Sequence, residues 1–115
     1  MNRILVEQDK LKNYQDSNII IKNNTITFLS SGDYTIEYIN CNNIELNINL
    51  EENIMIKLFE YADNQNIKVE NTYNLNSYST LILFKFYNNK EVLEKLIFNL
   101  NKSYSKLDYH FSNIC

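Results

Sequence analysis

The chain has 115 residues, of which 44% are hydrophobic and 22% are charged, as expected for one globular domain and too short for two. Fourteen acidic residues against eleven basic ones give a net charge of −3, which argues against a nucleic-acid-binding protein, because such proteins need a basic surface. No apolar run approaches the roughly 18 residues of a membrane span, and the first residues lack the apolar stretch of a signal peptide. We therefore expect a cytoplasmic protein that binds neither nucleic acid nor membrane.

Asparagine makes up roughly a fifth of the chain, whereas proline is absent and Gly32 is the single glycine. Turns normally use glycine and proline, so another residue type has to supply them here. Asparagine tolerates left-handed backbone angles better than other non-glycine residues, and its amide can bond to the nearby backbone. We therefore expect asparagine to form the turns.

A period-two alternation of apolar and polar residues runs through most of the chain. Between residues 43 and 50 it places Ile44, Leu46, Ile48 and Leu50 on one face, as in a strand with one buried side. The same alternation occurs in residues 25–28, 34–38, 54–58, 67–69, 81–86, 96–100 and 107–111. Short polar breaks separate these segments at intervals of about ten residues. The pattern predicts an all-β protein.

Residues 90–100 are the main competitor for a helix. Glu91 and Lys95 have the favourable i, i+4 spacing of a helical ion pair. However, Leu96 and Phe98 continue the period-two alternation into the next apolar segment, so we favour a strand.

The order of the strands is open from the pattern alone. An antiparallel β-sandwich or barrel needs tight hairpins, and the Asn-Gly and Asp-Gly dipeptides that favour them are absent. A β-solenoid stacks successive strands in parallel, and asparagine side chains can form hydrogen-bonded ladders along its axis. In either arrangement we expect one domain over residues 1–115, with residues 1–22 as a lead-in and residues 23–115 as the β-core.

In residues 69–87 a strand, a polar break and a second strand with a Leu-x-Leu precede an aromatic segment. This order resembles the core of the SufB/SufD family of iron–sulfur cluster assembly proteins. Residues 91–101 resemble the next rung, residues 106–112 the strand after it, and residues 54–60 the opening core strand. The resemblance spans roughly residues 44–115.

This resemblance implies a right-handed parallel β-helix that serves as a scaffold or accessory subunit in iron–sulfur cluster assembly. The implied partners are a SufC-like ABC-type ATPase or a full-length SufB/SufD subunit, and a transient iron–sulfur cluster would be shared with such a partner. The family's cysteine and histidine for cluster assembly lie in a region that this chain does not match, so no site residue is carried over. Because a solenoid exposes unpaired strands at its ends, we also expect end-to-end pairing with a partner or a second copy.

The candidate metal ligands are Cys115, His110 and Cys41. Imidazole and thiolate are ligands of iron–sulfur clusters and zinc, but the spacing matches no metal motif. His110 alternates with Tyr109 and Phe111, so we expect it to face solvent. A metal site within one chain is therefore disfavoured, and these residues could provide half of a site shared between subunits.

No sequence motif indicates catalysis, and the chain is not expected to be an enzyme. With one glycine, a glycine-rich phosphate loop cannot form. The acidic residues around Glu51 and Glu52, with Glu60 nearby, are interpreted as a solvated turn rather than an acid–base site.

Aromatic residues are expected to pack the core rather than to form a stacking platform. This expectation covers Tyr34, Tyr38, Phe84, Phe86, Tyr87, Tyr109 and Phe111. The alternative function is a small β-sandwich or cupin-like module that binds a ligand without a metal, because a cupin metal site normally uses several histidines.

Overall fold

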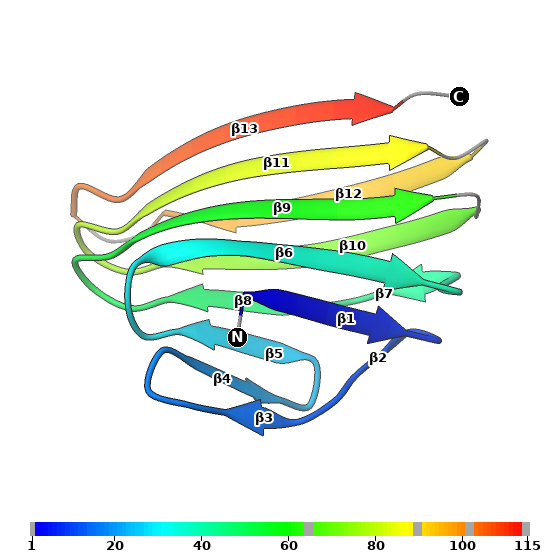
Figure 1. Cartoon of the computed structure of the whole chain (residues 1–115). Helices are drawn as coiled ribbons and strands as arrows, with labels where there is room; N and C mark the ends of the chain where they lie inside the picture. The colour runs from blue at the N-terminus through cyan, green and yellow to red at the C-terminus, as the bar shows by residue number, and fades with distance from the viewer. Residues whose placement is uncertain (1, 64–65, 89–90, 101–102, 114–115) are drawn as a thin grey trace.

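In the computed structural model, two β-sheets lie face to face and wind upward along one axis (Figure 1). The structure describes residues 2–63, 66–88, 91–100 and 103–113. These residues are strands and turns without a helix, which confirms the all-β prediction. Sheet A has the strand order β13-β11-β9-β6-β1-β2, and sheet B has the order β12-β10-β8-β5-β4-β3, with β7 beside β10.

The first half of the chain forms eight strands, which are β1 (Arg3–Glu7), β2 (Lys10–Leu11), β3 (Tyr14–Gln15), β4 (Ile19–Lys22), β5 (Thr25–Phe28), β6 (Gly32–Ile39), β7 (Asn43–Ile44) and β8 (Asn47–Leu50). The second half forms five longer ones, which are β9 (Met55–Asp63), β10 (Ile67–Leu75), β11 (Thr80–Asn88), β12 (Val92–Asn99) and β13 (Lys106–Asn113). Strand β12 lies within residues 90–100, the segment that could also have formed a helix, and confirms the predicted strand.

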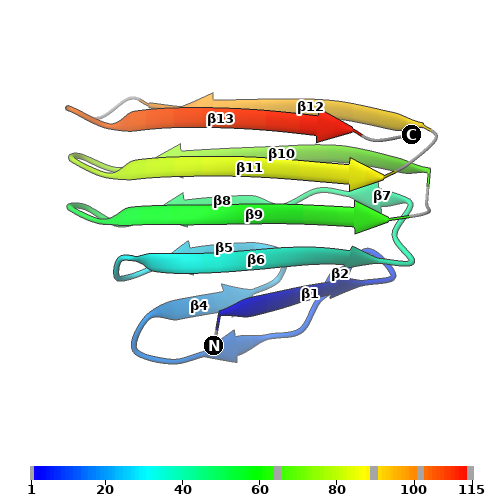
Figure 2. The ribbon, with the colours of Figure 1, turned by 45° about the horizontal axis from the view of Figure 1, so that its top comes forward.

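From β5 onward the chain winds back and forth between the sheets, and β8 to β13 each pair in parallel with the strand one coil earlier. Ile56 pairs with Leu81 on sheet A, and Ile48 pairs with Tyr73 on sheet B, so the coil has the same length at both places. The coil is right-handed, as parallel crossovers almost always are (Figure 2). The right-handed β-solenoid is therefore confirmed, and the antiparallel sandwich or barrel is wrong.

Antiparallel pairing occurs at the N-terminal end, where β1 pairs with β2, and β4 pairs with both β3 and β5. Residues 1–22, expected as a lead-in, thus contribute strands to both sheets. Asn23 and Asn24 form the two-residue turn between β4 and β5 with φ of 49° and 59°, as a type I′ turn requires. A tight hairpin therefore forms without glycine.

Asparagine supplies half of the left-handed backbone angles in the described residues. Four of the eight positive-φ residues are asparagines, and Gly32 has no positive φ. The expectation that asparagine forms the turns is therefore confirmed in part, and the other four positions are Gln8, Asp9, Tyr78 and Tyr104.

The core lies between the sheets and consists of the inward side chains of each strand. The alternating apolar residues of these segments are buried there, among them Ile44, Leu46, Ile48, Ile54, Ile56, Leu58, Leu81 and Leu83. Leu96 and Phe98 are half-buried. They belong to the last rung, which consists of β12 and β13, and no further strand covers the outer side of that rung.

The aromatic residues divide between the core and the surface. Tyr34, Tyr38 and Tyr87 are buried as expected, and Tyr109 is partly buried. Phe84 and Phe86 instead point outward from β11, because Leu83 and Lys85 occupy the inward positions between them. The expectation that both pack in the core is wrong.

The Asn23–Asn24 turn gives a test of the fold. Asn24→Gly should stabilise the protein by about 0.5 kcal/mol, because glycine removes the steric cost of a left-handed backbone. Asn47→Gly, on the outer face of a strand, should destabilise it by about 0.5–1 kcal/mol. Urea unfolding measures both changes, and destabilisation of the same size in both variants would contradict the assigned turn.

Candidate functional site

A charged pair lies in the interior of the solenoid. Glu60 of β9 and Lys85 of β11 are directly opposite each other in the parallel register. Both side chains are fully buried, and the Nζ and Oε1 atoms are 3.4 Å apart. Because an unpaired charge in an apolar interior is costly, each of these residues depends on the other.

The Glu60 carboxylate accepts hydrogen bonds from three further side chains. The hydroxyls of Tyr38 and Tyr73 donate to its two oxygens, and Asn71 Nδ2 donates at 3.1 Å. Asn71 Oδ1 in turn accepts the backbone N–H of Leu46 at 3.1 Å, at the break between β7 and β8. The carboxylate is thus held by neighbouring rungs on both sheets.

Lys85 connects this cluster to the last rung. Its Nζ lies 3.4 Å from Glu94 Oε2 of β12 and 3.3 Å from the hydroxyl of Tyr87. Tyr109 of β13 donates to Glu94 Oε1 at 2.6 Å. The Glu94 side chain is 14% exposed, so the network begins in the interior and reaches solvent at this end.

Burial keeps the phenols of the network protonated. It raises the pKa of Tyr38 and Tyr73 well above the ordinary value, and the negative charge of Glu60 adds to the shift. Burial likewise raises the pKa of Tyr87 and Tyr109, with a further contribution from Glu94. These hydroxyls therefore act as hydrogen-bond donors and do not function as bases.

The centre of the network is enclosed by the core. Glu60 and Lys85 have no exposed side-chain surface, so a substrate cannot contact them in this conformation. Fully satisfied buried polar networks fix one arrangement of the core, which is the role that this geometry supports.

The last rung has an open edge. In the described residues, β12 and β13 each pair with one neighbouring strand, on the side of the preceding rung. Inward side chains of this rung are half-exposed, including Leu96, Leu107 and Phe111, the last of which is 48% exposed. The opposite end of the solenoid is covered by the short antiparallel strands β2 and β3.

The two outer faces differ in chemistry. On sheet A, Phe59 stacks on Phe84 at 4.9 Å, Phe84 stacks on His110 at 4.8 Å, and Tyr61 stacks on Phe86 at 6.4 Å. On sheet B, Asn99 donates to Asn74 and Asn74 donates to Asn49, at 2.6 and 2.8 Å. The expected asparagine ladder is therefore confirmed.

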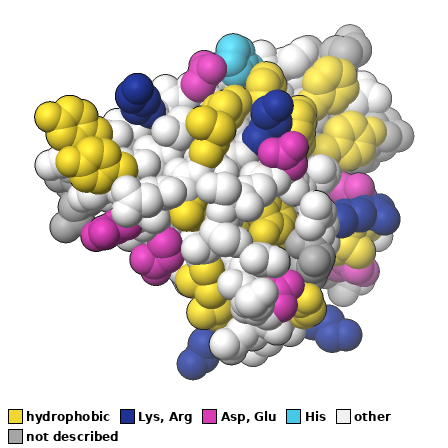
Figure 3. Space-filling view, turned by 60° about the vertical axis from the view of Figure 1, so that its left-hand side comes forward, with side chains coloured by type: hydrophobic (Ala, Val, Ile, Leu, Met, Phe, Trp, Pro, Cys, Tyr) yellow, Lys and Arg dark blue, Asp and Glu magenta, His cyan; other side chains and the backbone are white. Residues whose placement is uncertain are grey.

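A second aromatic pair lies on the connections from sheet B to sheet A. Tyr78 and Tyr104 are both exposed, and their rings stack at 5.2 Å. Figure 3 looks onto this side of the molecule, where hydrophobic side chains stand among charged ones.

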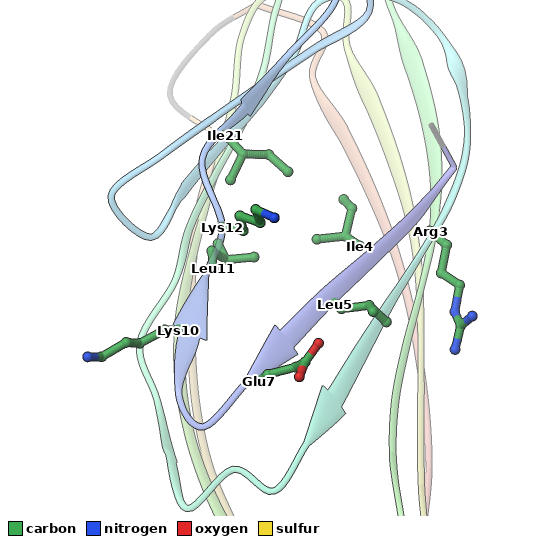
Figure 4. A pocket seen from close by; sticks show the side chains of 8 residues that line it. All are labelled: Arg3, Ile4, Leu5, Glu7, Lys10, Leu11, Lys12 and Ile21. Carbon is green, nitrogen blue, oxygen red and sulfur yellow. The ribbon is translucent and has the colours of Figure 1, made fainter.

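A groove of about 540 Å³ lies at the N-terminal end, between β1, β2 and β4 (Figure 4). Ile4, Leu11 and Ile21 form its apolar floor, and Lys12 lies between them in the close view. Arg3 at its rim is bound to Glu37 through two hydrogen bonds of 2.8 and 2.7 Å.

The three candidate ligands do not form a site in the described residues. His110 faces solvent, as expected, with 54% of its side chain exposed and its Nε2 atom 3.0 Å from Asp108. Cys41 is buried after β6, where its thiol donates to the Val6 carbonyl at 3.2 Å and burial raises its pKa. Cys115 lies outside the described residues, which contain no group of three or more ligand side chains able to hold a metal.

The sequence interpretation missed the interior network. Glu51 and Glu52 are exposed at a turn, as expected, but Glu60 is buried and does not belong to a solvated turn. The period-two pattern contained the signal, because Glu60 follows Ile56 and Leu58 at inward positions, and Lys85 occupies the equivalent position one coil later.

Comparisons with family models, with curated proteins and with solved structures find no match to this chain. Among the residues that the structure describes, no helix is long and apolar enough to cross a membrane.

The Glu60–Lys85 pair predicts strong energetic coupling. Lys85→Met should cost about 3–5 kcal/mol, because it leaves two carboxylates without their shared cation in the interior. The double variant Glu60→Gln/Lys85→Met should cost clearly less than the sum of the two single changes. Urea unfolding of the full cycle measures the coupling, and additive costs would contradict it. Arg3→Met, at the exposed pair with Glu37, is the control and should change stability much less.

The tyrosine pKa shifts predict loss of stability at alkaline pH. Phenols of the unfolded chain ionise near pH 10, whereas those of the folded network retain their protons, so folding binds protons above that pH. These phenols should therefore leave the free energy of unfolding level between about pH 8 and 10 and lower it as the pH rises further.

Urea titrations between about pH 8 and 12 measure this profile. Tyr73→Phe should reduce the slope by about 1.4 kcal/mol per pH unit, whereas the exposed control Tyr104→Phe should leave it unchanged. An equal effect of the two variants would show that the buried phenols do not carry the dependence.

Proposed function

We propose that this chain is a non-catalytic interaction protein that serves as a scaffold or accessory subunit in iron–sulfur cluster assembly. The open edge of the last rung is the observation that carries the proposal. Backbone groups at such an edge are not used by the sheet, and another polypeptide can pair with them by strand addition. The half-exposed core residues of β12 and β13 give the same surface an apolar component.

The SufB/SufD resemblance suggests which proteins bind at this edge. The resemblance implies a right-handed parallel β-helix, and the fold agrees with that expectation. His110 is the accessible candidate ligand of the described residues, so a cluster in transit would need ligands from a partner. The proposed role is therefore to position partners, with the cluster as their shared cargo.

The test uses the purified chain with a purified full-length SufB/SufD subunit and a SufC-like ABC-type ATPase from the same organism. Under anaerobic, reducing conditions we expect a stoichiometric complex by size-exclusion chromatography with light scattering. Phe111→Pro should weaken it by at least about tenfold, because proline removes a backbone donor and the aromatic ring from the open edge.

Asn47→Lys, on the outer face of sheet B, is the matched control and should bind like the unmodified chain. Circular dichroism of both variants verifies that the fold is retained. No complex with either protein would overturn the proposed role in cluster assembly.

A further inference from the structure

The open edge of the last rung fits one partner especially well. We infer that two copies of this chain join through their last rungs about a twofold axis near Tyr109 and Leu96, so that each sheet continues into the second copy. Strand β13 then pairs antiparallel with the second copy's β13, and β12 with the second copy's β12. This inference rests on the proposed binding role of the edge, and the second copy would compete with an assembly partner for that edge.

The hydrogen-bond pattern identifies the free backbone groups. Lys106 N donates to Ser79 O at 2.9 Å, so by the alternation of a parallel ladder residues 106, 108, 110 and 112 face β11. The N–H and C=O groups of Leu107, Tyr109 and Phe111 therefore point to the open edge. On sheet B, Ile67 N donates to Glu91 O at 3.2 Å, so residue 91 and every second residue after it face β10. The N–H and C=O groups of Val92, Glu94, Leu96 and Phe98 therefore point to the open edge.

The shape of the two ends favours a closed dimer over a filament. Head-to-tail stacking would place β12 and β13, each of eight residues, against the two-residue strands β2 and β3. Those strands cannot pair with most of the open edge. Contact between two identical last rungs matches strand lengths. It closes after two copies and leaves neither β12 nor β13 with an unpaired edge.

Charge selects the register of β13. With Tyr109 on the axis, Asp108 lies opposite the second copy's His110, and symmetry repeats that pair. Shifting the axis to residue 108 would oppose two aspartates, and shifting it to residue 110 would oppose two histidines. Of these three registers, the one centred on Tyr109 places a carboxylate opposite an imidazole N–H that can donate to it, and it avoids the opposed aspartates, so it is preferred.

The same axis suits the apolar side chains and the second strand. In this register Leu107 lies opposite Phe111 of the second copy, which covers two half-exposed residues. The rings of Tyr109 and Phe98 are 5.8 Å apart between centroids, and the Tyr109 hydroxyl donates to the Glu94 carboxylate. Leu96 lies between Glu94 and Phe98 on β12, so Tyr109 faces β12 near Leu96. An axis through Tyr109 and Leu96 thus brings together the edge-facing residues of both strands.

Sedimentation velocity over a micromolar to millimolar range tests the dimer. We expect a monomer–dimer equilibrium that Asp108→Lys weakens by about tenfold, because symmetry repeats each lost pair. The exchanged variant Asp108→Lys/His110→Asp should restore dimerisation. Asp33→Lys makes the same charge change on the outer face of β6 and should have no effect. A wild-type chain that stays monomeric, or an exchange that restores nothing, would overturn the inference.

Cross-linking tests the register separately. In a Cys115→Ser background, a mixture of Asp108→Cys and His110→Cys chains should form a disulfide between residue 108 of one copy and residue 110 of the other. Each variant alone should form much less. Equal cross-linking of the single variants would overturn the register centred on Tyr109.

The two proposals fail in different ways. A monomeric chain that still binds a SufB/SufD subunit would overturn the dimer but not the role in cluster assembly. A dimer with the mapped cross-link that binds neither assembly protein would leave the inference standing and overturn the proposed function.

Discussion

The structure depends on one constraint. From β5 onward every coil has nearly the same length, so each strand lies on its counterpart in the coil before. Ile56 under Leu81 and Ile48 under Tyr73 show the same sequence separation on the two sheets. Because parallel register lines up side chains of equivalent position, like residues form ladders along the axis. The asparagine ladder of sheet B and the aromatic stacks of sheet A both follow from this repeat.

The repeat also explains how a charged pair can occupy the core. Glu60 and Lys85 are one coil apart, so the same register that stacks leucine on isoleucine brings carboxylate to ammonium. The surrounding hydroxyls and the Asn71 amide come from both sheets and complete the hydrogen bonding. These hydrogen bonds and the ion pair offset the cost of burying the two charges, and the residues that make them come from three successive rungs.

The strands were accessible from the sequence, because period-two alternation defines them, whereas the pattern alone left their order open between a solenoid and an antiparallel sandwich or barrel. For residues 81–86 the pattern does not determine which side chains point into the core. Both faces of this strand are largely apolar, so the pattern did not reveal that Lys85 points inward and that Phe84 and Phe86 point outward. His110 was placed correctly on the solvent side, whereas the interior network required knowledge of which strands are neighbours. Because successive coils have little sequence similarity to one another, the sequence does not indicate which strands pair.

The interior network has a consequence for how the molecule unfolds. Solenoids whose rungs contact only their neighbours can lose terminal rungs one at a time, and their stability is nearly a sum over repeats. Here one connected set of hydrogen bonds runs from Tyr38 on β6 through Glu60 and Lys85 to Tyr109 on β13. Detaching the last rung would break contacts to the buried lysine and expose it. The polar network therefore links successive rungs into a single cooperative unit, so that a chain with the architecture of a repeat protein behaves energetically as one domain.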